Sequence, residues 1–338
     1  MFRSSNEAKG MGVAYHPLLL RWMAQGRLPA DFVEAPLEMY IDPARASLLD
    51  PDFGGLRRIA VEWPIAWRSS AFSLGSVEDP ADPSCSPVLL RRFAKICEAT
   101  RPAALIETIG FRRLDGRDFG RARRLPQTAI AADWLSAHCR RLRDAVGIPV
   151  LLQLGGGFDN PVRGDMQVIA FLERIAERTD CDFVIDVAHI EGLARETELD
   201  ARETVARLAR LPVAILTLSG EREAEWDLLA VALEAMHPSA IVLRRVQNLY
   251  PLDEIVAHLQ RASAALDRPR AAASPLRSAP AAPACEPTAA AELRAWQAAA
   301  IETAYANPDD LKFAAWRNWR RQLDETHKGH EIRKFLSA

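Results

Sequence analysis

Short apolar runs alternate with amphipathic stretches along roughly the first 260 residues of the chain. In the amphipathic stretches, such as 166–178, apolar residues recur at helical spacing. The apolar runs hold Val, Ile and Leu at consecutive positions, which is typical of parallel strands that are buried on both faces. Eight such runs occur, at 12–16, 31–36, 57–63, 104–111, 150–155, 182–188, 213–219 and 240–246. Their number and the length of chain predict an α/β fold, a (β/α)8 TIM barrel.

Several common enzyme motifs are missing from the sequence. The first predicted strand is not followed by a GxGxxG turn, which makes a doubly wound open sheet the less favoured alternative. The Gly155-Gly156-Gly157 run follows a predicted strand, but no Gly-Lys-Ser/Thr comes after it, so it is not a P-loop. No GxSxG nucleophile elbow is present.

The composition changes after residue 266. Residues 267–291 are almost wholly Ala, Pro, Ser and Arg, a composition that cannot bury apolar surface and is typical of an extended linker. The stretch that follows has helical patterning interrupted at Asn307-Pro308. We therefore expect a barrel domain at 1–266, a linker at 267–291 and a helical extension at 292–338.

Charge and composition narrow the class of protein. The 338 residues include 43 Lys and Arg against 45 Asp and Glu, a net charge of −2, so no basic field is available for nucleic acid. No apolar run is long enough to span a bilayer, and the first residues lack the apolar core of a secretory signal. The five cysteines are scattered without metal-site or disulfide spacing. These features predict a cytoplasmic protein with free thiols and no membrane contact.

Polar residues stand at the carboxyl ends of the predicted strands, where the active sites of such barrels lie. They are Glu34, Glu38, Glu62, Glu107, Gln153, Asp186 with His189, Thr217, Glu221, Arg244 and Arg245. If they converge on one mouth, the carboxylates and the histidine could bind a divalent cation. Alternatively, Arg244 and Arg245 neutralise the carboxylates in a salt-bridged network. Each residue taken alone could also be an ordinary solvated loop residue.

The extension is rich in tryptophan. In the segment 316–323, Trp316, Trp319 and Arg320 can share one face of a helix. Exposed Trp and Arg are frequent anchors of protein interfaces, so we expect these three residues to bind a partner. The alternative is that the aromatic residues pack back on the barrel or on each other.

An ordered series of short stretches resembles one known family. GMGVAYH with DFVEAPLEMY, then FSLGS, FLERIAERTDCDFVIDV and VLRRVQNLYPLDEIVAHLQRA are similar to stretches of the multinuclear non-heme iron-dependent oxidative enzymes. This family includes the methanobactin-biosynthesis oxidase, and the resemblance runs from about residue 10 to residue 263. It implies a (β/α)8 barrel that binds two or three irons and oxidatively modifies a peptide, usually with a small partner protein that recruits the precursor.

The metal-ligand positions implied by the resemblance are largely substituted. A family histidine appears as Thr108, a carboxylate as Gln153, two histidines as Thr217 and Glu221, and the last glutamate as Arg244. Asp186, with His189 beside it, stays in register with a ligand. Iron needs several His and carboxylate donors around one cavity, and an arginine there repels cations. We therefore expect no bound cofactor. The alternative is a residual site for a single iron or other divalent metal at Asp186, His189, Glu62 and Glu107.

These features support two hypotheses. In the first, the chain is a catalytically degenerate family member that binds a precursor peptide or an active paralogous enzyme in the biosynthesis of a peptide natural product or in metal handling. Gln153, Thr217 and Glu221 would then line the binding site. In the second, the chain is an active enzyme, either an iron-dependent oxidoreductase acting on a peptide or a barrel with a rebuilt site. Asp186 or Glu107 would then be the base and Arg244 the electrostatic stabiliser.

Overall fold

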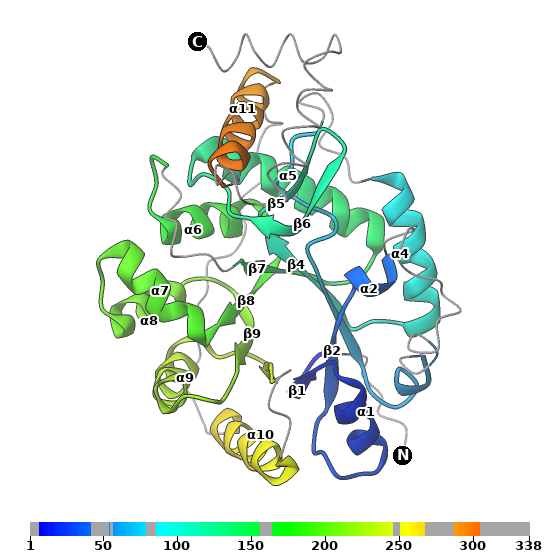
Figure 1. Ribbon diagram of the computed structural model, residues 1–338. Coiled ribbons are helices and arrows are strands. Elements are labelled where there is room, and N and C mark those ends of the chain that lie inside the picture. The colour runs from blue at the N-terminus through cyan, green and yellow to red at the C-terminus, as the bar shows by residue number, and fades with distance from the viewer. Residues whose placement is uncertain are drawn as a thin grey trace.

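A closed barrel of eight parallel strands forms the centre of the molecule (Figure 1). The computed structural model describes residues 7–41, 54, 57–78, 86–155, 164–245, 251–267 and 287–304. Around the barrel the strands are β1 (Gly10–Ala14), β10 (Ala240–Leu243), β9 (Val213–Leu218), β8 (Asp182–Asp186), β7 (Val150–Leu154), β4 (Ala104–Ile109), β3 (Ile65–Ser69) and β2 (Phe32–Pro36). This topology confirms the predicted (β/α)8 barrel.

Helices surround the strands on the outside of the barrel (Figure 1). They are α1 (Pro17–Ala24), α2 (Glu38–Ile41), α4 (Pro87–Thr100), α5 (Ala129–Val146), α6 (Val168–Arg178), α7 (Val187–Thr197), α8 (Ala201–Leu208), α9 (Glu223–Met236) and α10 (Leu252–Leu266). An antiparallel hairpin, β5 (Phe111–Leu114) and β6 (Arg117–Arg123), follows β4. Because it comes after a strand, the hairpin stands at the carboxyl end of the barrel, the end that we call the mouth.

The predicted strand at 57–63 is wrong. Residues 57–59 are helical, and the strand that pairs with β2 and β4 is β3, at Ile65–Ser69. The backbone N–H groups of Glu62 and Trp63 both donate to the carbonyl of Ile59, so this stretch closes a turn. Pro64 has no backbone N–H to donate to a neighbouring strand. Its carbonyl accepts the backbone N–H of Val33, which is the first hydrogen bond between β2 and the chain that leads into β3. The apolar residues of the run belong to this turn, and Val61 is 74% exposed.

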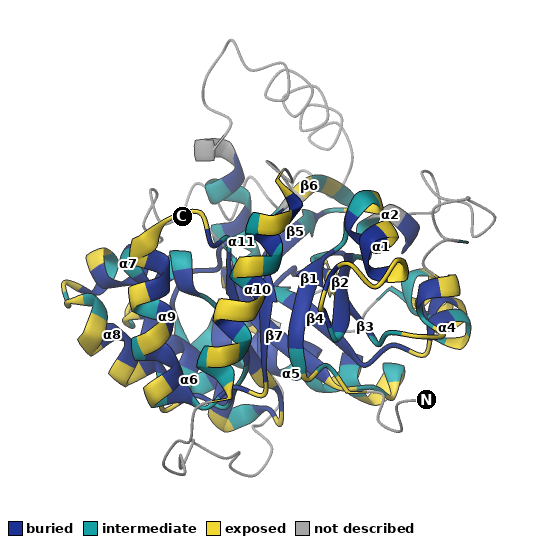
Figure 2. Cartoon of the chain, turned by 90° about the horizontal axis from the view of Figure 1, so that it is seen from below, coloured by how far each residue is buried: buried dark blue, intermediate teal, exposed yellow. Residues whose placement is uncertain are grey.

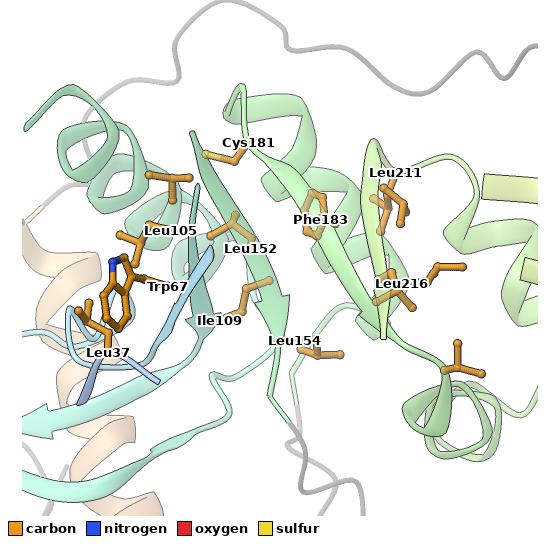
Figure 3. Packing of buried hydrophobic residues seen from close by; sticks show 14 of the residues in the cluster. Leu37, Trp67, Leu105, Ile109, Leu152, Leu154, Cys181, Phe183, Leu211 and Leu216 are labelled. Carbon is orange, nitrogen blue, oxygen red and sulfur yellow. The ribbon is translucent and has the colours of Figure 1, made fainter. Parts of the chain in front are cut away.

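The strands bury both faces, as the continuous apolar runs predict (Figure 2). A small cluster fills the barrel: Phe32, Ala66, Ala104, Ile106, Leu151, Val184, Ile215, Ala240 and Val242. A larger cluster packs between the strands and the helices, and Figure 3 shows part of it around Trp67, Leu152 and Phe183. Gly12 leaves room inside the barrel, because a Cβ at this position would lie 2.4 Å from the Phe32 ring.

Helix α11 (Pro287–Ala304) packs on α5 and on β5, as Figure 1 shows in orange. It begins inside the stretch predicted as linker, because Pro287 suits the first turn of a helix and the alanines after it have the highest helix propensity. Ala290, Leu293 and Ile301 of this helix are buried. The start of the predicted extension is therefore joined to the barrel by apolar packing.

None of the helices that the structure describes is both long and apolar enough to cross a membrane.

Candidate functional site

Polar side chains form a layer inside the barrel at its mouth. Along each strand, side chains alternate between the two faces, so the residue two places after an interior apolar residue also points inward. The inward residues nearest the mouth on seven strands are Glu34, Arg68, Thr108, Gln153, Asp186, Thr217 and Arg244, each two places after a member of the interior cluster. Strand alternation therefore brings together residues that are far apart in the sequence.

Arg244 and Glu34 are at the centre of this layer. The Arg244 Nη2 donates to Glu34 Oε2 at 2.7 Å, and its Nε donates to Oε1 at 3.0 Å. Arg68 also bonds this carboxylate, from its Nε to Glu34 Oε1 at 3.0 Å. The Glu34 side chain is only 1% exposed, so its charge is balanced by two guanidinium groups and not by water.

Arg244 also joins the strands on the other side of the barrel. Its Nη2 donates to Gln153 Oε1 at 2.9 Å, and its Nη1 lies 3.5 Å from Asp186 Oδ2. The second oxygen of Asp186 accepts the backbone N–H of Ala188 at 3.0 Å and so caps helix α7. We call Glu34, Arg68, Gln153, Asp186 and Arg244 the mouth cluster. Its formal charges sum to zero, two positive and two negative.

His189 lies in the first turn of α7, next to the mouth cluster. Burial lowers its pKa, and the positive charges of Arg244 and Arg124 lower it further, whereas Asp186 opposes the change. Arg124 is itself held by a bidentate pair with Glu196, at 2.8 Å for both bonds. The structure thus favours a neutral imidazole beside Asp186.

Thr217 and Glu221 lie in different environments. Thr217 is fully buried, and its hydroxyl has no hydrogen-bond partner among the described residues. Glu221 is exposed in the loop after β9, where its backbone N–H bonds to Ser219 Oγ at 3.2 Å. Of the predicted binding residues, Gln153 and Thr217 face into the barrel, whereas Glu221 does not contact the mouth cluster in any described bond.

Glu107 does not face the mouth, which corrects the expected convergence. Its neighbours Ile106 and Thr108 point into the barrel, so Glu107 points outward. There the backbone N–H of Ser73 donates to its Oε1 at 3.1 Å, and its Oε2 has no hydrogen-bond partner among the described residues. Burial raises the pKa of Glu107 to about 8, and the nearby Glu38 carboxylate adds to the rise.

Glu107 belongs to a second polar group outside the barrel wall. Glu38 accepts the Ser70 backbone N–H at 2.6 Å and lies 3.7 Å from Arg112 Nη1. Ser73, which bonds Glu107, also accepts the Arg112 backbone N–H through its hydroxyl at 2.6 Å. We call Glu38, Ser70, Ser73, Glu107 and Arg112 the outer cluster. It links β4 to α2, the loop after β3 and the hairpin.

Glu62 lies at the opposite end of the barrel from Asp186. It is exposed and precedes β3, whereas Asp186 ends β8, and all barrel strands are parallel. The four residues predicted as a residual metal site are thus divided among the amino end, the outer cluster and the mouth. Only Asp186 and His189 adjoin. No group of three or more His, Cys, Asp or Glu that could hold a metal ion occurs within the described ranges.

Arg68 is a mouth residue that the sequence did not reveal, because the apolar pattern predicts this strand at 57–63, whereas β3 is Ile65–Ser69. With the strand placed at IAWRS, side-chain alternation directs Ala66 and Arg68 into the barrel, and this pattern would have identified Arg68. Arg245, predicted with Arg244, points outward instead and pairs with Glu254 of α10 at 2.7 Å. The predicted partner-binding residues Trp316, Trp319 and Arg320 lie outside the described residues.

The model of one protein family matches residues 10–267, which is nearly the whole barrel. Its description is RiPP precursor modification enzyme MbnB/TglH/ChrH. This chain belongs to that family. The match confirms the family that the ordered motifs indicated, and α11 lies outside the matched range.

Proteins from several bacteria are similar to this chain over most of its length. A UPF0276 protein of Bordetella bronchiseptica is 25% identical over 290 residues, covering 79% of this chain and 97% of the relative. One from Rhizorhabdus wittichii is 25% identical over 253 residues, covering 68% and 84% of the two chains. Among solved structures, D-psicose 3-epimerase from Clostridium cellulolyticum H10 is similar with a TM-score of 0.48 and 11% identity, over 76% of this chain and 97% of that one.

The two or three irons implied by the resemblance do not fit the mouth cluster. Iron sites need unengaged His and carboxylate donors around one space. Here the Arg244 guanidinium fills that space, with both Glu34 oxygens and one Asp186 oxygen within 3.5 Å. A cation at this position would have to displace a buried positive charge that three side chains hold in place.

Proposed function

We propose that this chain is a family member that binds a peptide or an active paralogous enzyme in the modification of a ribosomal peptide, without a multi-iron centre of its own. The ion-paired mouth cluster carries this proposal. Arg244 stands where the resemblance implies a glutamate ligand, and it engages Glu34, Gln153 and Asp186 together. In this barrel, an arginine forms hydrogen bonds and an ion pair with side chains at the expected metal-ligand positions. Such a site is suited to binding and not to iron-dependent oxidation.

Metal analysis tests the loss of the iron centre. The full chain is incubated with excess ferrous iron without oxygen and freed of unbound metal, and its iron content is then measured. We expect less than one iron per chain, and two or more would overturn the proposal in favour of an active oxidase. Arg244→Glu returns a carboxylate to this position and is expected to retain more iron than the wild type. Arg207→Glu, on the exposed face of α8, is the charge-matched control.

Binding is tested with synthetic precursor peptides encoded beside the gene. Arg68 is suited to this role because its side chain is 44% exposed and only its Nε has a described bond. Its terminal nitrogens can therefore donate to a peptide carbonyl or carboxylate. We expect Arg68→Ala to weaken peptide binding about tenfold, the loss of roughly one charge-assisted hydrogen bond. Arg207→Ala should leave binding unchanged, and equal affinities of the two variants would count against a site at the mouth.

A rebuilt active site is the second candidate. Asp186 is 17% exposed and lies 3.5 Å from Arg244, so a carboxylate base and a fixed positive charge share the open end of the barrel. In this case Asp186→Asn would abolish turnover of a bound peptide while leaving unfolding by denaturant nearly unchanged. Unaltered turnover in this variant would remove Asp186 from the chemistry.

A further inference from the structure

Two buried cysteines meet at the amino end of the barrel, far from the mouth. Cys139 lies on α5, and Cys181 is the residue before β8. Their sulfur atoms are 3.0 Å apart, although 42 positions separate them in the sequence. Cys139 is 0% and Cys181 1% exposed. Figure 3 shows Cys181 at the end of the sheet opposite Leu154. Both are thiols in this structure.

The surroundings of Cys181 favour the reactive form of its thiol. The hydrogen bond with Cys139 lowers the pKa of Cys181, and the positive charge of Arg143 and a bond with Thr179 act in the same direction, against the effect of burial. Arg143 is held nearby by Asp180, at 2.9 Å. A thiolate is the nucleophile in cysteine oxidation, so Cys181 is the member of the pair that would react first.

Cys97 provides the contrast within the same chain. It is partly buried on α4, where burial and the negative charge of Glu98 raise its pKa to about 12. It therefore remains a thiol at neutral pH, and no described sulfur atom lies beside it. Proximity and an adjacent guanidinium are thus specific to the pair formed by Cys139 and Cys181.

We propose that Cys139 and Cys181 are a redox modification site that closes to a disulfide when the chain meets hydrogen peroxide. The Cys181 thiolate attacks one peroxide oxygen, the O–O bond breaks, and Cys181 becomes a sulfenic acid as hydroxide leaves. The Cys139 sulfur then attacks the Cys181 sulfur, the S–O bond breaks, and the second oxygen leaves as water. Two thiols and one peroxide give one disulfide and two waters, so the two electrons lost by sulfur reduce the peroxide.

The position of the pair determines what the bond would do. It would join α5 to β8 and enclose β7 and α6 in one covalent loop. Such a loop restricts the unfolded chain, which raises stability. Because the amino end of a (β/α)8 barrel serves stability and the opposite end carries function, the bond should leave the mouth cluster undisturbed.

The test uses a full-length variant in which Cys85, Cys97 and Cys285 are serine, so that only the pair remains. It is treated with hydrogen peroxide, unfolded with N-ethylmaleimide, digested and mapped by mass spectrometry. We expect a cross-linked peptide containing both cysteines, and a rise in Tm of roughly 5–10 °C that dithiothreitol reverses. Cys139→Ala or Cys181→Ala in the same background should give neither the cross-link nor the rise.

Three results would overturn the proposal: alkylation of both cysteines after peroxide, sulfinic acid on Cys181 without a cross-link, or a cross-link that lowers Tm. If the serine variant does not fold, the same peptide mapping is carried out on the wild-type chain. There, a disulfide that links either cysteine to Cys85, Cys97 or Cys285 would equally refute it.

Discussion

Glu34 and Glu107 are both buried glutamates near the carboxyl ends of barrel strands, but their side chains point in opposite directions and have different partners. Glu34 points inward and accepts hydrogen bonds from two arginines, Arg68 and Arg244. Glu107 points outward, where the backbone N–H of Ser73 donates to it and no arginine side chain bonds it in the described contacts. Burial raises the pKa of Glu107 to about 8. The charge of a buried carboxyl group thus depends on which face of the strand it occupies and on which partners that face supplies.

The same difference separates the mouth cluster from the outer cluster. The mouth cluster is an ion-paired network in which the Arg68 side chain is 44% exposed. The outer cluster is a closed layer that holds the loop after β3 and the hairpin against the barrel. Four variants test this comparison, in order of decreasing expected effect.

Arg244→Ala should have the largest effect on stability. The change leaves Glu34 and Asp186 without their shared partner, and removing one member of a buried ion pair typically costs about 3–5 kcal/mol. The free energy of unfolding in urea is the measurement. Adding Glu34→Gln should recover part of the loss, since the second variant removes the uncompensated charge. A loss no greater than that in Arg207→Ala would contradict the buried network.

Glu107→Gln should change how stability depends on pH. The pKa of Glu107 is raised in the folded chain, so the folded chain holds this proton more tightly than the unfolded chain does. The free energy of unfolding therefore falls as pH rises from 4.5 to about 8. The fall should amount to a few kcal/mol in the wild type. The Glu107→Gln variant should lack this part of the fall in the free energy of unfolding. Parallel profiles between pH 5 and 8 would refute an outer cluster that holds a proton.

Gln297→Leu should weaken the attachment of α11 to the loop after β3. This side chain is fully buried, accepts the Val77 backbone N–H at 3.1 Å and donates to the Gly75 carbonyl. Removing both bonds leaves two buried backbone groups unpaired, at a cost of about 1–3 kcal/mol. Hydrogen exchange at 72–78 should become faster, while exchange in β8 stays unchanged. Glu292→Gln, on the exposed side of α11, is the control, and equal exchange in the two variants would refute the docking role.

Arg68→Ala should affect stability least, by about 0.5–1 kcal/mol. Glu34 keeps the two-atom contact with Arg244, and the lost side chain is 44% exposed. Urea unfolding of this variant and of Arg244→Ala gives the direct contrast. A loss as large as that of Arg244→Ala would mean that both arginines are needed to neutralise Glu34.

Much of the architecture follows from local pattern. Six of the eight predicted runs contain a barrel strand and a seventh, at 12–16, overlaps one, because continuous Val, Ile and Leu positions suit strands that are buried on both faces. The run at 57–63 fails because apolar content alone does not separate a turn from a strand, and Pro64 marks the boundary. Helix α11 begins at Pro287, inside the stretch whose composition predicts a linker, since an Ala-rich sequence is compatible with both an extended linker and a packed helix.

The sequence by itself determined the (β/α)8 barrel and the family. Only the tertiary structure decided that Arg244 bonds Glu34 and Gln153, that Glu107 faces away, and that Cys139 meets Cys181. The reason is geometric. Periodicity along the chain reveals that a strand exists, but one residue of register reverses the face of every side chain, and closure of the barrel sets which strands adjoin.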